Sequence, residues 1–287
     1  MGKSELMTII EIGLIFSLVT LGVYLTYRMS DLPDLSVDGT FPLGAAISAK
    51  LLLAGISPPL AIILSIAGGA ISGFITAYLH VKFKISALLS GIITMIALYS
   101  INLRIMGSGN LSFFSAPTVF SDLPKIGLLI GIAGLLIFAL WYFLTTEYGL
   151  ALRASGVNAE GSEMQGINTH KMKFTIYMLS NALVALAGSL YAQTQGFADI
   201  SMGTGIIIAG IASLILGEAL IKNSKVIDAL LACLVGALLY RLVISLALHV
   251  NGLGLQASDL NLITALFVVI FMLLPKIKQK QMRRAIK

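Results

Sequence analysis

Nine long apolar runs, separated by short polar segments, dominate this sequence. A helix that crosses the hydrocarbon core of a bilayer needs about 20 mostly apolar residues, and it satisfies its backbone polar groups internally. The runs of roughly this length cover residues 6–27, 42–57, 58–79, 85–103, 125–144, 173–193, 203–221, 226–248 and 259–275. The pattern predicts an all-α, polytopic membrane helix bundle with about 8–10 transmembrane segments.

Composition excludes several other classes of protein. Hydrophobic residues make up 57% of the chain and charged residues only 11%, which is too apolar for a soluble domain. The single cysteine, Cys233, lies in an apolar run, and the three histidines are far apart, so we expect neither a disulfide nor a metal site. The net charge of +6 comes from short loops and the basic C-terminal tail, so we expect no binding of nucleic acid.

The basic segments also predict how the chain is oriented. They lie near residues 80–84, 153–173, 222–225 and 276–287, and alternating crossings put all of them on one side, which the positive-inside rule makes cytoplasmic. The N-terminus is then outside, and the acidic segment 28–40 is inside or embedded. Two explanations of that segment stay open: a discontinuous second helix whose polar start dips into the membrane, or a single crossing by residues 42–80. We expect one transmembrane domain over residues 1–287, with a cytoplasmic loop at 145–172 and a cytoplasmic tail at 276–287.

The polar passage at residues 146–173 contains a predicted short helix, "NAEGSEMQ". Asn158 is a good N-cap, Glu160 falls in the first turn, and Gly166 can end the helix in a left-handed conformation. So short a helix is marginal alone in water. It suits a helix that docks in a groove of a partner protein, and the alternative is an ordinary solvated loop. The apolar residues expected to be exposed there are Val157, Met164 and Ile167.

The stretch "GLALRASGVNAEGSEMQGIN" resembles the cytoplasmic coupling segment of permease subunits of ABC importers, in the family that serves branched-chain amino acids and simple sugars. The following "LSNALVALAGSLYAQTQG" is similar to the family's next helix. The early "DLPDLSVDGTFPLGAA" resembles a subgroup assigned to tryptophan or tyrosine. The matching positions of the coupling segment are Gly149, Ala151, Arg153, Ala154, Gly156, Asn158, Gly166, Ile167 and Asn168.

This resemblance implies a permease subunit of an ATP-driven importer that moves a small solute, an aromatic amino acid being favoured, across a bacterial plasma membrane. It implies no cofactor in this chain, because ATP and Mg²⁺ would bind a separate cytoplasmic ATPase. The other implied partners are an extracytoplasmic substrate-binding protein, a second copy or a similar permease, and membrane lipid. The residues expected to couple to the ATPase are Arg153, Gly156, Asn158, Glu160, Glu163, Met164, Gly166 and Ile167.

Polar residues inside or beside apolar runs are candidates for the substrate path. An ionisable group within a span costs about 2.5–3.5 kcal/mol, so it usually faces the interior of the bundle and often marks a pathway. Helix capping and interhelical hydrogen bonds remain alternative roles for them. Glu218 and Lys222 are spaced as a structural ion pair. The candidates for the path are Asp34, Asp38, Thr40, Ser90, Thr94 and Asn102.

Small residues bear on helix contacts and on an internal repeat. The pairs Gly69/Gly73 and Gly127/Gly131 have the spacing of close helix crossings, although chance gives the same spacing. The strings at 39–48 and 203–213 are alike, as in transporters built from inverted repeats, and short Gly/Ala-rich strings also match by chance.

Two other classes of function are weighed against the permease. An ion-coupled secondary transporter or a channel is the alternative function, and it would need a complete ion-coupling site within one chain. A membrane enzyme is disfavoured, because the predicted spans contain no paired carboxylate, histidine or cysteine constellation.

Overall fold

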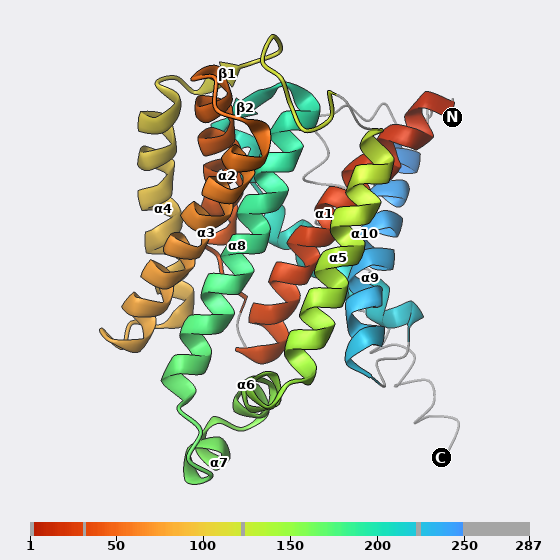
Figure 1. Cartoon of the computed structure of the whole chain (residues 1–287). Helices are drawn as coiled ribbons and strands as arrows, with labels where there is room; N and C mark the ends of the chain where they lie inside the picture. The colour runs from red at the N-terminus through yellow and green to blue at the C-terminus, as the bar shows by residue number, and fades with distance from the viewer. Residues whose placement is uncertain (1–2, 31–32, 122–123, 222–224, 249–287) are drawn as a thin grey trace.

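Membrane-length helices run side by side in the computed structural model, which describes residues 3–30, 33–121, 124–221 and 225–248 (Figure 1). Two short strands pair at one end of these helices, and two short helices lie at the other. The long helices are α1 (Lys3–Met29), α2 (Val37–Leu53), α3 (Pro58–Val81), α4 (Ala87–Met106), α5 (Lys125–Thr145), α8 (Thr169–Gln195), α9 (Ile206–Leu220) and α10 (Val226–Leu248). The short elements are β1 (Asn110–Ser112), α6 (Glu147–Val157), α7 (Ala159–Met164), β2 (Phe197–Asp199) and the 3₁₀ helix η1 (Ile200–Gly203).

Seven helices in the described ranges are long and apolar enough to cross a membrane, which confirms the predicted all-α polytopic bundle. They correspond to seven of the nine predicted runs. The run at 42–57 coincides with α2, which has only 17 residues and is mostly buried among other helices. The run at 259–275 and the basic tail at 276–287 lie outside the described residues.

The second helix, α2, runs without a break over Val37–Leu53, so it is not discontinuous, but its polar start is embedded as one of the two sequence hypotheses proposed. Residues 33–36 between α1 and α2 form no long helix, yet Asp34 and Ser36 are buried. The other hypothesis, a single crossing by residues 42–80, is wrong. The chain turns at residues 54–57, and α3 returns antiparallel to α2, since Thr40 contacts Ser72 and the Ser65 hydroxyl donates to the Gly44 carbonyl at 3.1 Å.

Helix α8 is central to the packing, and α1, α2 and α3 cross it closely (Figure 1). A Cβ on Gly69 or Gly73 would stand 2.4 or 2.1 Å from a carbonyl oxygen of α8, so this predicted helix contact is confirmed. The second pair makes no such contact among the described residues. A Cβ on Gly127 would touch only its neighbouring Pro124, and one on Gly131 would meet no described atom within 4 Å, because this face of α5 is open.

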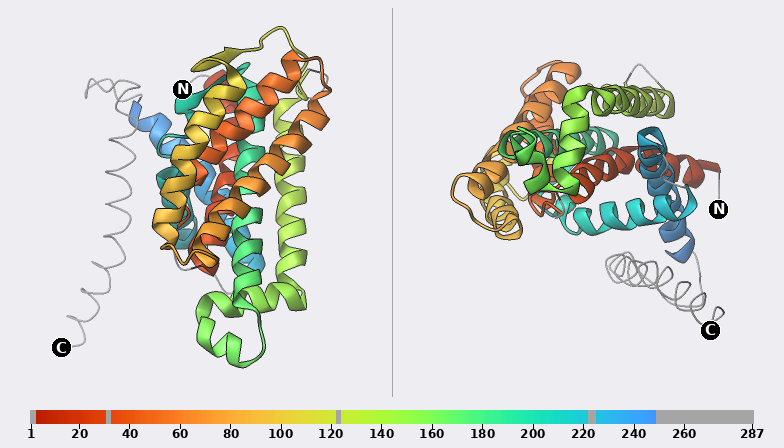
Figure 2. Two further views of the ribbon diagram at one scale, coloured as in Figure 1. Left: turned by 90° about the vertical axis from the view of Figure 1, so that its left-hand side faces the viewer. Right: turned by 90° about the horizontal axis from the view of Figure 1, so that it is seen from below.

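The basic segments singled out in the sequence lie at one end of the bundle. The segments carrying Lys82, Arg153 and Lys171 all lie at the end where α6 and α7 extend beyond the long helices (Figures 1 and 2). Lys173 and His80 approach each other there at 3.2 Å, although they belong to α8 and α3. At the opposite end β1 pairs with β2 in antiparallel register. The predicted clustering of basic segments on one side therefore agrees with the fold.

Candidate functional site

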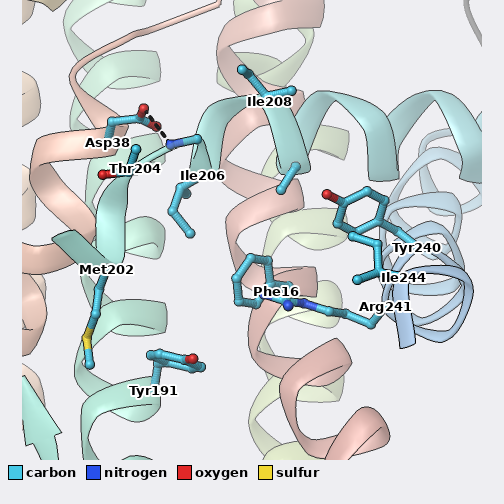
Figure 3. Close-up of a pocket in the computed structure, with 12 residues that line it drawn as sticks. Phe16, Asp38, Tyr191, Met202, Thr204, Ile206, Ile208, Tyr240, Arg241 and Ile244 are labelled. Carbon is cyan, nitrogen blue, oxygen red and sulfur yellow. Dashed lines mark hydrogen bonds between the residues drawn. The ribbon is translucent and has the colours of Figure 1, made fainter. Parts of the chain in front are cut away.

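A cavity of about 440 Å³ lies between α1, α8, α10 and the start of α9 (Figure 3). Its walls combine aromatic rings with one carboxylate and one guanidinium. Such a mixture of apolar surface and few polar groups is typical of a small-molecule site. The lining residues used below are Phe16, Asp38, Tyr191, Met202, Tyr240 and Arg241.

Asp38 joins the start of α2 to the start of α9. Its carboxylate accepts the backbone N–H groups of Ile207 at 2.8 Å and Gly205 at 3.2 Å. Gly205 occupies the N-cap position of α9 with φ +78° and has no side chain to cap the helix. Asp38 therefore supplies from α2 the acceptor that the exposed amides of α9 need.

The two similar strings at 39–48 and 203–213 begin close to the starts of α2 and α9. They meet directly, because a Cβ on Gly203 would stand only 1.8 Å from the carbonyl oxygen of Asp38. This contact places the glycine-containing starts of two apolar segments side by side. The internal repeat itself stays a prediction.

Replacing Asp38 with alanine is expected to lower the free energy of unfolding by about 1–2 kcal/mol, because the first turn of α9 loses its acceptor. Asp38→Asn keeps one carbonyl oxygen in reach and should cost less. Thermal unfolding of the two variants in detergent measures the difference in Tm. An alanine variant as stable as the wild type would show that this contact does not hold α9.

Arg241 brings the only described positive charge on the cavity wall. Its guanidinium lies over the ring of Phe16, 3.5 Å from the centroid, which is a close cation–π contact. Its Nε atom is buried and has no hydrogen-bond partner among the described residues. Phe16 belongs in turn to an aromatic group with Phe41 and Tyr191, whose ring centroids are 5.7–6.2 Å apart.

A buried polar network holds the start of α2 against α8. Asp34 accepts the Asn181 amide at 2.7 Å and the Ser36 hydroxyl at 2.7 Å. The Asn181 carbonyl oxygen accepts the Thr40 hydroxyl at 2.6 Å, and Thr40 also contacts Ser72 of α3. The network thus links three helices through hydrogen bonds, and it surrounds a carboxylate that no described cation neutralises.

The remaining path candidates lie on α4. Asn102 donates to the Gly39 carbonyl at 3.1 Å, and Thr94 bonds to Thr76 and to the backbone oxygen of Ser90. Of the six candidates only Asp38 lines the described cavity, and the other five lie in contacts between helices. Their place in a substrate path stays a prediction.

The segment predicted to couple to an ATPase forms two consecutive helices, α6 and α7. Asn158 caps α7 by accepting the Gly161 N–H at 2.9 Å, and Gly166 has φ +82°, both as predicted. Val157 and Met164 are 87% and 89% exposed. The expectation for Ile167 is wrong, because this side chain is half-buried against the core.

The other members of the coupling set are divided between the exterior and the bundle. Glu160 and Glu163 are exposed, and Glu163 accepts the Thr169 hydroxyl. Arg153 on α6 is partly buried, and its Nε has no described hydrogen-bond partner. Gly156 lies on the backbone of Met29, where a Cβ would meet three atoms at 2.6–2.8 Å.

Among the described residues Glu218 pairs with Arg28, and its predicted pairing with Lys222 stays a prediction. Glu218 accepts from Arg28, with 2.9 Å between Nε and Oε1, which ties α9 to the end of α1. Lys222 lies outside the described residues. Arg28 was missed because a contact between residues so far apart in sequence leaves no local pattern.

Sequence reasoning also missed the residues that define the cavity, namely Phe16, Tyr191, Tyr240 and Arg241. One signal could have found the last of them. Arg241 is an ionisable residue in the middle of the apolar run 226–248, and such residues usually face a bundle interior. The aromatic residues carry no comparable signal, because an aromatic side chain in an apolar helix is ordinary.

Long apolar helices packed around a cavity define a polytopic membrane protein. The chain belongs to the permease family of ABC transporters described as "Branched-chain amino acid transport system / permease component", whose model matches residues 6–274. This membership confirms the resemblance seen in the coupling segment. It also favours a permease over the alternative of an ion-coupled secondary transporter or channel.

Two relatives and one solved structure illustrate the similarity. The chain is 40% identical to the "Tyrosine transport system permease protein" of Clostridioides difficile (strain R20291), over 97% of this chain and 99% of that one. It is 25% identical to the "Ribose import permease protein RbsC" of Escherichia coli (strain K12), over 96% and 87% of the two chains. In fold it resembles a chain of "PsaBC from Streptococcus pneumoniae in complex with Fab", with a TM-score of 0.55 at 15% identity, covering 93% of this chain and 88% of that one.

Proposed function

We propose that this permease imports aromatic amino acids across a bacterial plasma membrane. The substrate class is supported by the 40% identity, along nearly the whole chain, to a relative named as a tyrosine transport permease. The similarity of "DLPDLSVDGTFPLGAA" to the tryptophan and tyrosine subgroup agrees with it. The cavity beside α10 is lined by aromatic rings and has a suitable volume.

The exposure of α7 is the observation that supports energy supply by a separate subunit. The end of α6 and the short helix α7 protrude beyond the long helices (Figure 2), and they present Val157 and Met164, respectively, to solvent. Exposed apolar side chains on a short helix favour docking in a groove of another protein. We infer that a separate cytoplasmic ATPase, which holds ATP and Mg²⁺, binds here, and that this chain does not hydrolyse ATP itself.

The charge distribution supports the orientation. The end with α6 and α7 carries the basic segments and faces the cytoplasm, together with the C-terminal tail at 276–287. The end with β1 and β2 then faces outward, where a substrate-binding protein would deliver the amino acid. A second copy of this chain, or a similar permease, completes the transporter in this proposal.

Uptake into sealed vesicles tests the function. Proteoliposomes that contain the chain, its ATPase and the binding protein should accumulate radiolabelled tyrosine or tryptophan only when ATP is supplied on the ATPase side. Ribose and leucine serve as comparison solutes. Uptake driven by an ion gradient without the ATPase would instead establish a secondary transporter.

Met164→Asp is expected to reduce ATP-driven uptake about tenfold or more, because a charge replaces an exposed apolar side chain of the proposed docking surface. The Met164 side chain is 89% exposed, so the Tm of the permease alone should not change. Met164→Leu, which keeps an apolar side chain, is the matched control and should transport normally. Normal uptake by the aspartate variant would contradict docking at α7.

A further inference from the structure

Arg241 is a charged group whose requirements the described part of the chain does not meet. Placing an arginine in the middle of a span costs about 2.5–3.5 kcal/mol, which is usually offset by a partner. The cation–π contact with Phe16 attracts the charge but accepts none of its hydrogen bonds. The buried Nε has no described acceptor, so at least one donor is left for a ligand.

The chemistry of the guanidinium selects the ligand. Its planar fork of N–H donors matches a carboxylate, which it can bind through two parallel hydrogen bonds. The one described carboxylate on the cavity wall is Asp38, and its oxygens already accept the amides of α9. Figure 3 shows Asp38 and Arg241 on different sides of the cavity, with Phe16 and Ile206 between them. The unmatched charge of the cavity is therefore positive.

The surroundings of Arg241 fit the rest of an aromatic amino acid. Phe16 and Tyr191 present ring surfaces from α1 and α8, with centroids 6.2 Å apart. Met202 lies near Tyr191 in Figure 3, and thioether groups pack well against aromatic rings. The volume of about 440 Å³ falls in the range of small-molecule sites.

We propose that the cavity is a binding site for the transported amino acid, in which Arg241 binds the α-carboxylate and the side-chain ring packs against Tyr191 and Met202. This inference rests on the proposed function for the identity of the substrate. It adds a site inside the membrane domain and a residue that discriminates by the carboxylate. Tyr191 and Phe16 position the ring and the guanidinium.

Three related probes test the site on the assembled permease–ATPase complex in lipid nanodiscs. They are tyrosine, tyramine, which lacks the carboxylate, and 3-(4-hydroxyphenyl)propanoate, which lacks the ammonium group. Equilibrium binding should rank tyrosine and the propanoate about 10- to 100-fold above tyramine, since each loss of a charged hydrogen-bond partner is large in a buried site. Equal affinity for tyramine would overturn the role of the carboxylate.

Variants of Arg241 supply the second measurement. Arg241→Met should weaken tyrosine binding about tenfold or more and remove the preference over tyramine. Arg241→Lys keeps the charge without the fork, so it should retain part of the preference and guards against a methionine variant that fails to fold. Arg104→Met, an exposed arginine near the end of α4, is the matched control and should bind as the wild type does. Unchanged binding in both Arg241 variants would overturn the proposal.

The outcomes separate this inference from the proposed function. If the wild type imports tyrosine with ATP and Arg241→Met imports it equally well, the site is wrong and the function stands. If the wild type imports no aromatic amino acid but the carboxylate probe still binds through Arg241, the site stands and the substrate class is wrong.

Discussion

Asn181→Leu should leave little folded protein, because Asn181 is the residue through which the polar network between α2 and α8 is hydrogen-bonded. The Asn181 amide donates to Asp34 at 2.7 Å and to the Tyr177 carbonyl at 3.0 Å, and its oxygen accepts from Thr40 and Ser36. Leucine has a similar size but none of these groups. Asp34 is then a buried carboxylate that keeps only its bonds from Ser36.

The expected loss is about 3 kcal/mol or more in the free energy of unfolding, because a buried charge that loses a donor has no access to water. Thermal unfolding in detergent, together with the yield of monodisperse protein, measures the loss. Ser189→Ala is the matched control on the same helix. The Ser189 hydroxyl is buried without a described partner, so its removal should leave Tm unchanged or raise it. Equal stability of the two variants would contradict the structural role of the network.

Gly188→Ala should disrupt the crossing of α2 and α8 by adding a single methyl group. A Cβ at position 188 would stand 1.9 Å from the carbonyl oxygen of Phe41, and a Cβ on Gly44 would stand 2.0 Å from the carbonyl oxygen of Ala185. The two backbones would have to separate by roughly 1 Å or more. Overpacking of this kind typically lowers the free energy of unfolding by about 1–3 kcal/mol. The separation would also shift Phe41, which packs against Phe16 and Tyr191 beside the cavity.

Gly131→Ala is the control for this change. The position lies in a membrane-length helix, yet a Cβ there would meet no described atom within 4 Å. Helix propensity then favours alanine by up to about 1 kcal/mol. A fall in Tm for Gly188→Ala beside no fall for Gly131→Ala is the expected pair of results. A similar response at both positions would contradict the close crossing of α2 and α8.

The sequence predicts those parts of this fold that depend on local patterns. Apolar length located the membrane helices, and the capping residues Asn158 and Gly166 located both ends of α7, because a cap acts within one turn. Charge distribution placed the basic segments at one end. The embedded polar start of α2 was anticipated from the acidic segment 28–40, whereas the expected discontinuity of this helix was not found.

The cavity was not predictable in the same way, because its walls come from distant parts of the chain. Phe16, Tyr191 and Arg241 lie on three helices, and only packing brings them together. Glycine spacing was equally ambiguous. Gly69 and Gly73 contact α8, whereas Gly127 and Gly131 have the same spacing and contact no described helix. The spacing therefore permits a close helix crossing, and whether one forms depends on which helix packs against it.

The contact between Gly156 and the backbone of Met29 has a mechanical consequence. Since no side chain separates the backbones of α6 and α1 there, α6 cannot tilt without displacing the last turn of α1. Helix α1 has 27 residues, a stiff rod about 40 Å long, and Phe16 stands midway along it. A displacement of the last turn of α1 therefore moves the helix that carries the Phe16 ring in contact with Arg241, without a relay of intervening side chains.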